Sequence, residues 1–299
     1  MTDSSTPVFH KILFPVDLSP ASVAAVPFVK EMAHAHGATI TLMQVVQLPA
    51  PWYPPDGGVP ITAYDVNELL ELAASQLADF KGQHFADISS AALQVDQYCE
   101  EGDAALSIVD HARRSHTDLI MMPTHGLGPF RRLLLGSVTA KVLHDAECAV
   151  WTGAHVEESP VKEHASVRSI LCAVDTNAAS AGLIAQAAGL AAKHSAVLRL
   201  VHSVPGMETR PQKYFDAEFE RGLMASARDQ IAAMQRDLKS NFEVCVAAGT
   251  LSKVIQSAAL EHQADLIVIG RGVLQETLGR LRTNAYAIVR DSPCPVISF

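Results

Sequence analysis

KILFPVDLSPAS, residues 11–22 of the chain, recurs 158 positions later as SILCAVDTNAAS, residues 169–180. Each copy places a short apolar run before a Val-Asp pair, Val16-Asp17 in the first and Val174-Asp175 in the second. Three further blocks recur in the same order: an apolar run after a turn, the pentapeptides DLIMM and DLIVI, and the tripeptides CAV and CPV. The matching blocks predict a duplicated domain of about 140 residues, within the usual size range of a domain.

The duplication divides the chain into two domains, residues 1–153 and 167–299, with a linker at residues 154–166. A chain of 299 residues with 48% apolar content is long enough for each domain to bury its own core. The formal net charge of −9 argues against a general nucleic-acid surface, which normally shows a basic stripe. The sequence has no apolar leader at its start and no run long enough to span a membrane. We therefore expect a cytoplasmic protein that binds neither nucleic acids nor membranes.

The five cysteines show neither a CxxC motif nor the paired spacing of a zinc site, and they are Cys99, Cys148, Cys172, Cys245 and Cys294. We expect no disulfide framework and no metal site. Cys148 and Cys294 occupy equivalent positions in apolar segments, so they are expected to be small buried core residues.

Four histidines near predicted helix ends are candidate metal ligands, and they are His34, His36, His111 and His116. Thirteen scattered histidines without a HExxH or similar spacing favour solvent-facing positions at helix ends over a metal site.

Short apolar runs alternate with amphipathic segments through both copies. Helices are expected at residues 19–36, 62–86, 104–116 and 137–145, and in the second copy at residues 180–194, 212–240, 251–262 and 283–290. The alternation implies right-handed crossovers and a doubly wound, mainly parallel, Rossmann-like sheet of five strands in each domain, two such sheets in tandem. Such sheets bind ligands outside the carboxyl ends of their strands, where Asp17 and Asp175 follow the first strand of each copy. The Pro-rich insert at residues 48–60 is expected to be an irregular loop near the same edge.

The most specific functional signal is a glycine-containing loop that joins a buried strand to a helix. It reads Pro123-Thr-His-Gly126, then nine residues, then Gly136-Ser137. Glycines let phosphate oxygens approach the backbone, and the unpaired N–H groups of a helix N-terminus favour an anion. The loop predicts a phosphate site whose donors are a hydroxyl group and first-turn amides, from Ser137, Val138 and Thr139.

Together with the Val-Asp strand, this loop resembles the universal stress protein family, whose nucleotide-binding members carry Gly-x2-Gly-x9-Gly followed by Ser or Thr. The resemblance covers nearly the whole chain, and RRLLLGSVTAKVLHDAECAV, residues 131–150, closely matches the family's last segment. It implies two tandem domains of the adenine nucleotide alpha hydrolase-like fold. It also implies a stress-response protein that binds ATP or a related adenine nucleotide, with or without Mg²⁺, in the first domain only.

The resemblance assigns roles to individual residues of the first domain. Pro15, Val16 and Asp17 would contact adenine and ribose, and Val45 would supply a backbone contact to the base edge. The rest of the ribose and the phosphates would be held by Met122, Gly126, Gly136, Ser137, Val138 and Thr139. Pairing of the last strands, residues 148–152 and 295–299, would make an internal pseudo-dimer. A further homodimer and an unidentified protein partner stay open.

Both copies depart from the family pattern. Pro123 replaces the first glycine of the loop and has no N–H to donate. Losing one neutral hydrogen bond costs about 0.5–1.5 kcal/mol, or about two- to tenfold in affinity, which weakens ATP binding without excluding it. In the second copy Val273 stands at the position of the loop's second glycine, unless Gly272 supplies it in a loop one residue shorter. Arg282 stands where Gly136 stands in the first copy, and Ser203 replaces Val45. We predict a degenerate second site.

Several residues of the candidate site allow more than one interpretation. Asp17 and Asp175 are either ribose ligands or N-terminal caps of the helices that follow them. His125 is interpreted as a variable loop residue, since no nucleophile or carboxylate base lies beside it. The sequence contains no GK[ST] motif and no evident carboxylate pair for Mg²⁺, so efficient phosphoryl transfer has little support. The leading hypothesis is a nucleotide-responsive regulator, and the alternatives are a scaffold that binds no nucleotide and a slow ATPase.

Overall fold

The structure is a computed structural model that describes residues 9–48, 65–88, 93–124, 135–153, 166–206, 217–271 and 281–299. Within these ranges each half contributes five strands and four α-helices. The first half contains β1 (Lys11–Pro15), α1 (Pro20–His36), β2 (Thr39–Val46), α2 (Val66–His84), the short 3₁₀ helix η1 (Ala86–Ile88), β3 (Val95–Glu101), α3 (Ala104–Ser115), β4 (Leu119–Pro123), α4 (Ser137–Asp145) and β5 (Ala149–Gly153). The second half contains β6 (Ser169–Ala173), α5 (Ala179–His194), β7 (Val197–Val204), α6 (Ala217–Asp237), β8 (Glu243–Ala248), α7 (Leu251–Glu261), β9 (Leu266–Ile269), α8 (Leu281–Asp291) and β10 (Val296–Ser298).

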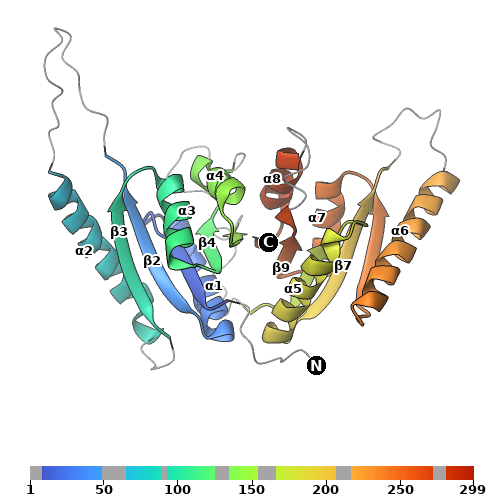
Figure 1. Ribbon diagram of the computed structural model, residues 1–299, viewed down its shortest axis with the longest axis horizontal. Helices are drawn as coiled ribbons and strands as arrows, with labels where there is room; N and C mark the ends of the chain where they lie inside the picture. The colour runs from blue at the N-terminus through green and yellow to red at the C-terminus, as the bar shows by residue number, and fades with distance from the viewer. Residues whose placement is uncertain are drawn as a thin grey trace, which may run out of the picture.

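The two five-stranded halves form one continuous sheet in the order β3-β2-β1-β4-β5-β10-β9-β6-β7-β8. All pairs inside each half are parallel, as predicted. The halves meet where β5 and β10 pair antiparallel, with Ile297 opposite Trp151. Figure 1 shows the halves side by side, with the C-terminal end of the chain at the junction. The last strands therefore pair as the family resemblance implied.

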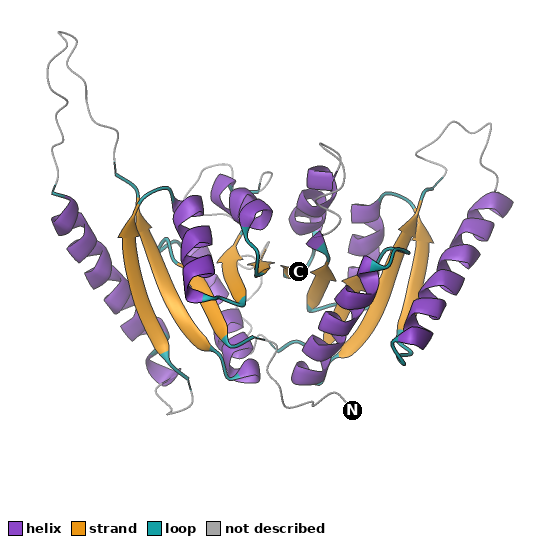
Figure 2. Ribbon diagram, viewed as in Figure 1, coloured by secondary structure: helices purple, strands orange, loops and turns teal. Residues whose placement is uncertain are grey.

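Helices cover both faces of the sheet (Figure 2). One buried cluster joins the sheet to α1, α2, α5 and α6, and a second joins it to α3, α4, α7 and α8. Successive residues of β1 alternate between the two clusters, with Ile12 and Phe14 in the first and Leu13 in the second. Because both faces are buried, central strands such as β4 (LIMMP) and β9 (LIVI) are apolar throughout, whereas the edge strand β3 (VDQYCEE) carries charged residues.

The predicted element boundaries agree closely with the described ones. The helix predicted at residues 137–145 matches α4, and the helix predicted at residues 62–86 is described from Val66, after the cap residue Asp65. Most of the Pro-rich insert and all but the last residue of the linker lie outside the described residues. All five cysteines are free thiols; Cys294 is buried as expected, whereas Cys148 is only partly buried.

The prediction that His36 faces solvent at a helix end is wrong, because its side chain is buried. The residue is only 3% exposed, and its ring lies 5.4 Å from that of His194 and 5.0 Å from that of Phe9. The last turns of α1 and α5 meet at the junction, where Figure 1 places the two helices side by side. His34 and His116 are exposed as expected, whereas His111 is half-buried.

Candidate functional site

The carboxyl ends of β1 and β4 form the switch point of the first half. β1 and β4 are neighbours in the sheet. Helix α1, which follows β1, packs on one face of the sheet, whereas α3, which precedes β4, packs on the other. A crevice at such a point is where doubly wound sheets bind ligands. Asp17 follows β1, and α4 begins after β4, so the topology places the two predicted parts of the site at the same edge.

Asp17 lies in a tight turn between β1 and α1. Its Oδ1 accepts hydrogen bonds from the amide of Ser19 at 3.0 Å and the hydroxyl of Ser22 at 2.6 Å. Ser19, and not Asp17, caps α1, because its side chain accepts from the amide of Ser22. The Asp17 residue is exposed, and its Oδ2 has no hydrogen-bond partner among the residues that the structure describes. The turn thus orients the carboxylate and leaves one oxygen for a ligand.

The start of α4 offers a hydroxyl and amides without a side-chain cap. Gly136 is the N-cap residue and has no side chain that could accept a hydrogen bond from the first-turn N–H groups. The amide of Gly136 donates to the Thr124 carbonyl at 2.9 Å, and the Thr139 hydroxyl donates to the Pro123 carbonyl at 3.1 Å. These two groups therefore hold the helix against the end of β4, whereas Ser137 is exposed.

Val45 lies on β2, two residues past Met43, which is opposite the last residue of β1. The Thr39 amide donates to the His10 carbonyl, and the Val16 amide donates to the Met43 carbonyl at 2.7 Å. Every second residue of β2 from Thr39 therefore presents its main chain toward β1. Because β1 ends at Pro15, opposite Met43, the main chain of Val45 faces the space above Val16 and Asp17.

The remaining predicted residues form the buried base of this edge or lie outside the described ranges. Val16 is 4% exposed and packs in the cluster under α1, whereas Met122 is 6% exposed and packs in the cluster under α4. Pro123 is the last residue of β4 and pairs with Gly153. Gly126 and His125 lie outside the described residues.

The second half differs at the equivalent edge. Asp175 uses both carboxylate oxygens within its own turn, accepting from the Thr176 amide at 2.7 Å and the Asn177 side chain at 3.1 Å. The hydroxyl of Ser203, at the position of Val45, donates to the Gly249 carbonyl at 2.9 Å. Arg282 lies in the first turn of α8, but its side chain is outside the described set.

Arg271 follows Gly270 at the end of the second half's β9 and crosses the junction. Its guanidinium donates to the carbonyls of Ala146 and Cys148 in the first half. Burial lowers the pKa of this guanidinium, and the nearby Cys148 opposes that shift. The charge lies just beyond the C-terminus of α4, where the helix dipole favours a cation. The residue thus joins the two halves instead of binding a ligand at its own edge.

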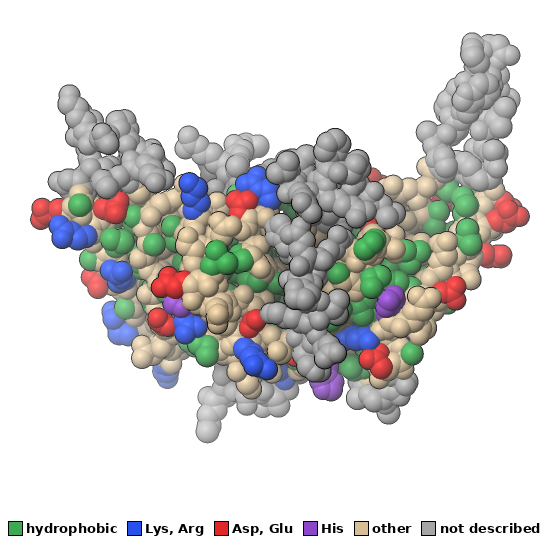
Figure 3. Space-filling view, turned by 180° about the vertical axis from the view of Figure 1, so that it is seen from behind, with side chains coloured by type: hydrophobic (Ala, Val, Ile, Leu, Met, Phe, Trp, Pro, Cys, Tyr) green, Lys and Arg blue, Asp and Glu red, His purple; other side chains and the backbone are tan. Residues whose placement is uncertain are grey.

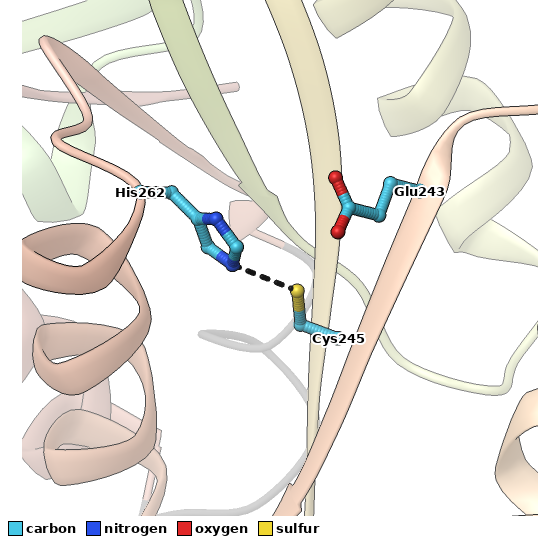
Figure 4. Close-up of side chains that lie close together, drawn as sticks. All are labelled: Glu243, Cys245 and His262. Carbon is cyan, nitrogen blue, oxygen red and sulfur yellow. Dashed lines mark hydrogen bonds between the residues drawn. The ribbon is translucent and has the colours of Figure 1, made fainter.

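A second group of side chains meets at the far edge of the second half. Glu243 and Cys245 from β8 and His262 after α7 bring three potential metal-ligand atoms within 4.8 Å of one another (Figure 4). Burial, followed by the nearby Glu243 and Glu261 carboxylates, raises the pKa of the Cys245 thiol. Sequence reasoning missed this group because Cys245 and His262 are 17 residues apart and match no metal-ligand motif.

Acidic and basic side chains are intermixed over the flanks of the face shown in Figure 3. Among the described helices, none combines the length and apolar character needed to cross a membrane.

The fold and its duplication define a tandem α/β protein with a doubly wound, mainly parallel sheet in each half. The sequence profile of the universal stress protein family matches residues 9–152 and again residues 166–298. The chain therefore belongs to the universal stress protein family, in a tandem form.

Relatives of known family agree with this assignment. The chain is 30% identical over 157 residues to a universal stress protein of Methanocaldococcus jannaschii, an alignment that covers 52% of this chain and 86% of the relative. A relative from Thermus aquaticus is 31% identical over 143 residues, covering 48% of this chain and 97% of the relative. A crystal structure of a universal stress protein from Archaeoglobus fulgidus aligns with a TM-score of 0.63 at 19% identity, covering 99% of this chain and 97% of the other. This last likeness shows the shared tandem fold.

Proposed function

We propose that this universal stress protein binds ATP or a related adenine nucleotide at the switch point of its first half and acts as a nucleotide-responsive regulator in the cytoplasm. The observation that carries the proposal is the convergence of an oriented, exposed Asp17 carboxylate and the uncapped start of α4 at one edge of the sheet. In this proposal Asp17 accepts from the ribose hydroxyls, and the main chain of Val45 contacts the base. The phosphates lie against the first turn of α4 and the Ser137 hydroxyl.

The phosphate end of the site has few donors in the described residues. The Gly136 amide and the Thr139 hydroxyl are already bonded within the protein, and Pro123 has no amide hydrogen. Ser137 and the remaining first-turn amides would therefore carry the phosphate contacts. A modest affinity follows, and the ligand would occupy the site when its cellular concentration is high.

Isothermal titration calorimetry with ATP tests the proposal on the full chain. We expect one ATP per chain for the wild type, no binding for Gly136→Arg, and binding weakened by about 10- to 150-fold for Asp17→Ala, the loss of a hydrogen bond to a charged group. Asp175→Ala is the matched control, because it removes the equivalent carboxylate of the second half, and it should bind as the wild type does. Absence of binding at millimolar ATP, or unchanged binding by Gly136→Arg, would reject the nucleotide site.

The second candidate is a scaffold that binds no nucleotide and acts through protein contacts. Pro123 and the internally bonded amide of Gly136 favour it, because both remove donors from the phosphate region. Mass spectrometry and absorbance at 260 nm of the purified, untreated protein distinguish the two candidates. Bound adenine nucleotide would eliminate the scaffold. A slow ATPase would additionally require turnover that is lost in the Asp17 and Ser137 variants.

A further inference from the structure

Three side chains of different chemistry converge beside the edge strand of the second half. Glu243 and Cys245 are two residues apart on β8, so their side chains lie on the same face of the strand. His262 follows the last residue of α7 and turns its ring toward that face (Figure 4). The Cys245 Sγ and the His262 Nε2 are 3.2 Å apart. The group therefore consists of one thiol, one imidazole and one carboxylate directed at a shared point.

The spacing of these three atoms is close to the spacing of ligand atoms around a tetrahedrally coordinated metal ion. Zinc bonds of about 2.3 Å to sulfur and about 2.1 Å to nitrogen or oxygen place neighbouring ligand atoms roughly 3.6 Å apart. The observed separations run from 3.2 Å for the Cys245 and His262 atoms to no more than 4.8 Å within the group. The spacing of roughly 3.6 Å that zinc requires lies between these two values.

We propose that Glu243, Cys245 and His262 form a zinc site, with water as the fourth ligand. A thiolate with an imidazole and a carboxylate suits a borderline-soft divalent ion, whereas magnesium and calcium prefer oxygen ligands alone. The ion reaches the site from solvent, since β8 is an edge strand and the Glu243 side chain is 59% exposed.

Arg199 competes with a metal ion for the Glu243 carboxylate. Its Nε lies 2.7 Å from Oε2 of Glu243, the residue directly opposite it on the sheet. The other carboxylate oxygen can bind the ion while this ion pair persists, because a carboxylate accepts bonds at both oxygens. A positive charge so close to the site lowers the affinity for a cation, so Glu243 is expected to be the weakest of the three ligands.

The site belongs to the second half alone. Cys245 pairs with Val201 across the sheet, and the equivalent pair in the first half is Tyr98 with Met43. The residue equivalent to Glu243 in the first half is therefore Asp96, and no thiol stands at the position of Cys245 there. The proposal does not depend on nucleotide binding at the first half.

Bound zinc would tie the end of α7 to the edge strand. An ion that binds the folded state and not the unfolded chain stabilises the fold by an amount that grows with its concentration. Since the thiol must lose its proton to bind, affinity should rise with pH.

Cobalt and zinc titration of the tag-free, chelator-treated full chain tests the site. Co²⁺ should produce a thiolate-to-metal charge-transfer band with one equivalent per chain, and one equivalent of Zn²⁺ should abolish it. Cys245→Ser should lose the band, and His262→Gln should weaken Zn²⁺ binding by more than the roughly 10- to 100-fold that loss of an outer-shell partner costs. Glu243→Gln should cause the smallest loss of the three.

Cys99→Ser is the matched control, because it removes a half-buried thiol from β3, the opposite edge strand. It should keep the band and the stoichiometry of the wild type. Circular dichroism checks that each variant is folded. Three results would overturn the proposal: no thiolate band in the wild type, unchanged zinc affinity in folded Cys245→Ser, or equal losses in Cys245→Ser and Cys99→Ser.

Discussion

Lowering the pH from 7 to 5 should destabilise the folded protein through a histidine pair at the junction of its halves. Neither ring nitrogen of His36 has a hydrogen-bond partner among the described residues, and Nε2 of His194 is likewise buried without one. Burial, followed by the neighbouring His194, Lys193 and His10, lowers the pKa of His36 to about 3. Burial also lowers the pKa of His194, and the Glu31 carboxylate, 3.9 Å from its Nδ1, does not reverse that direction.

Acidification lowers the free energy of unfolding because the pKa of His36 is lower in the folded protein than in the unfolded chain. In the unfolded chain His36 binds a proton near its ordinary pKa of 6.5, whereas in the folded protein it does not until about pH 3. Its stabilising contribution is therefore complete above pH 6.5 and is lost progressively as the pH falls toward 3. Between pH 7 and pH 5 the loss from His36 alone is about 2 kcal/mol, and His194 adds to it in the same direction. With a urea dependence of about 3 kcal/mol per molar, the unfolding midpoint should fall by about 0.7 M.

Urea unfolding of the wild type, His36→Phe and His34→Gln at pH 7 and pH 5 measures this effect. Phenylalanine fills the space between Phe9 and His194 without a titratable group, so His36→Phe should lose about 2 kcal/mol less than the wild type on acidification. His34→Gln removes an exposed histidine from the same helix and should behave as the wild type does. Equal acid losses in the wild type and His36→Phe would refute the reasoning.

Three further substitutions test the packing of the fold. Arg271→Met should lower the free energy of unfolding by about 2–3 kcal/mol in urea titration, since it removes charged donors from the carbonyls of Ala146 and Cys148; a loss below about 0.5 kcal/mol would show that these bonds do not hold the junction. Trp151→Ala should cost about 3–5 kcal/mol in the same assay, because the side chain is 1% exposed and fills the core at β5; a loss of about 1 kcal/mol would contradict that packing. Asp103→Ala should lower the melting temperature, because the Asp103 carboxylate caps α3 through two amides, and an unchanged melting temperature would argue against the cap.

Local sequence patterns predicted the order of strands and helices and the edge of the sheet that carries Asp17 and Ser137. They succeeded because the central strands are short apolar runs and because helices such as α1 are bounded by capping residues, Ser19 and Gly37, whose roles depend only on neighbours in the chain. The sequence left Asp17 as either a ribose ligand or the N-terminal cap of α1, and in the structure Ser19 is the cap.

Contacts between distant segments could not be read from the same patterns. His36 is the final residue of an amphipathic helix and is buried only because α5 meets it across the junction. Arg271 was not assigned a role, since its carbonyl partners lie more than 120 residues away along the chain. The residues of the proposed zinc site come together only when α7 folds back over β8, which no spacing rule expresses.

The antiparallel contact of β5 with β10 has a consequence for how this protein can change. Because both strands belong to one polypeptide, their association is intramolecular and does not weaken on dilution, unlike that of separate subunits. In a symmetric pair of identical subunits every substitution at the interface appears twice. Here Arg271 donates across the interface to the carbonyls of Ala146 and Cys148, while the equivalent position of the first half holds a threonine, Thr124. Covalent fusion thus frees each side of the contact to acquire residues that its twin does not share.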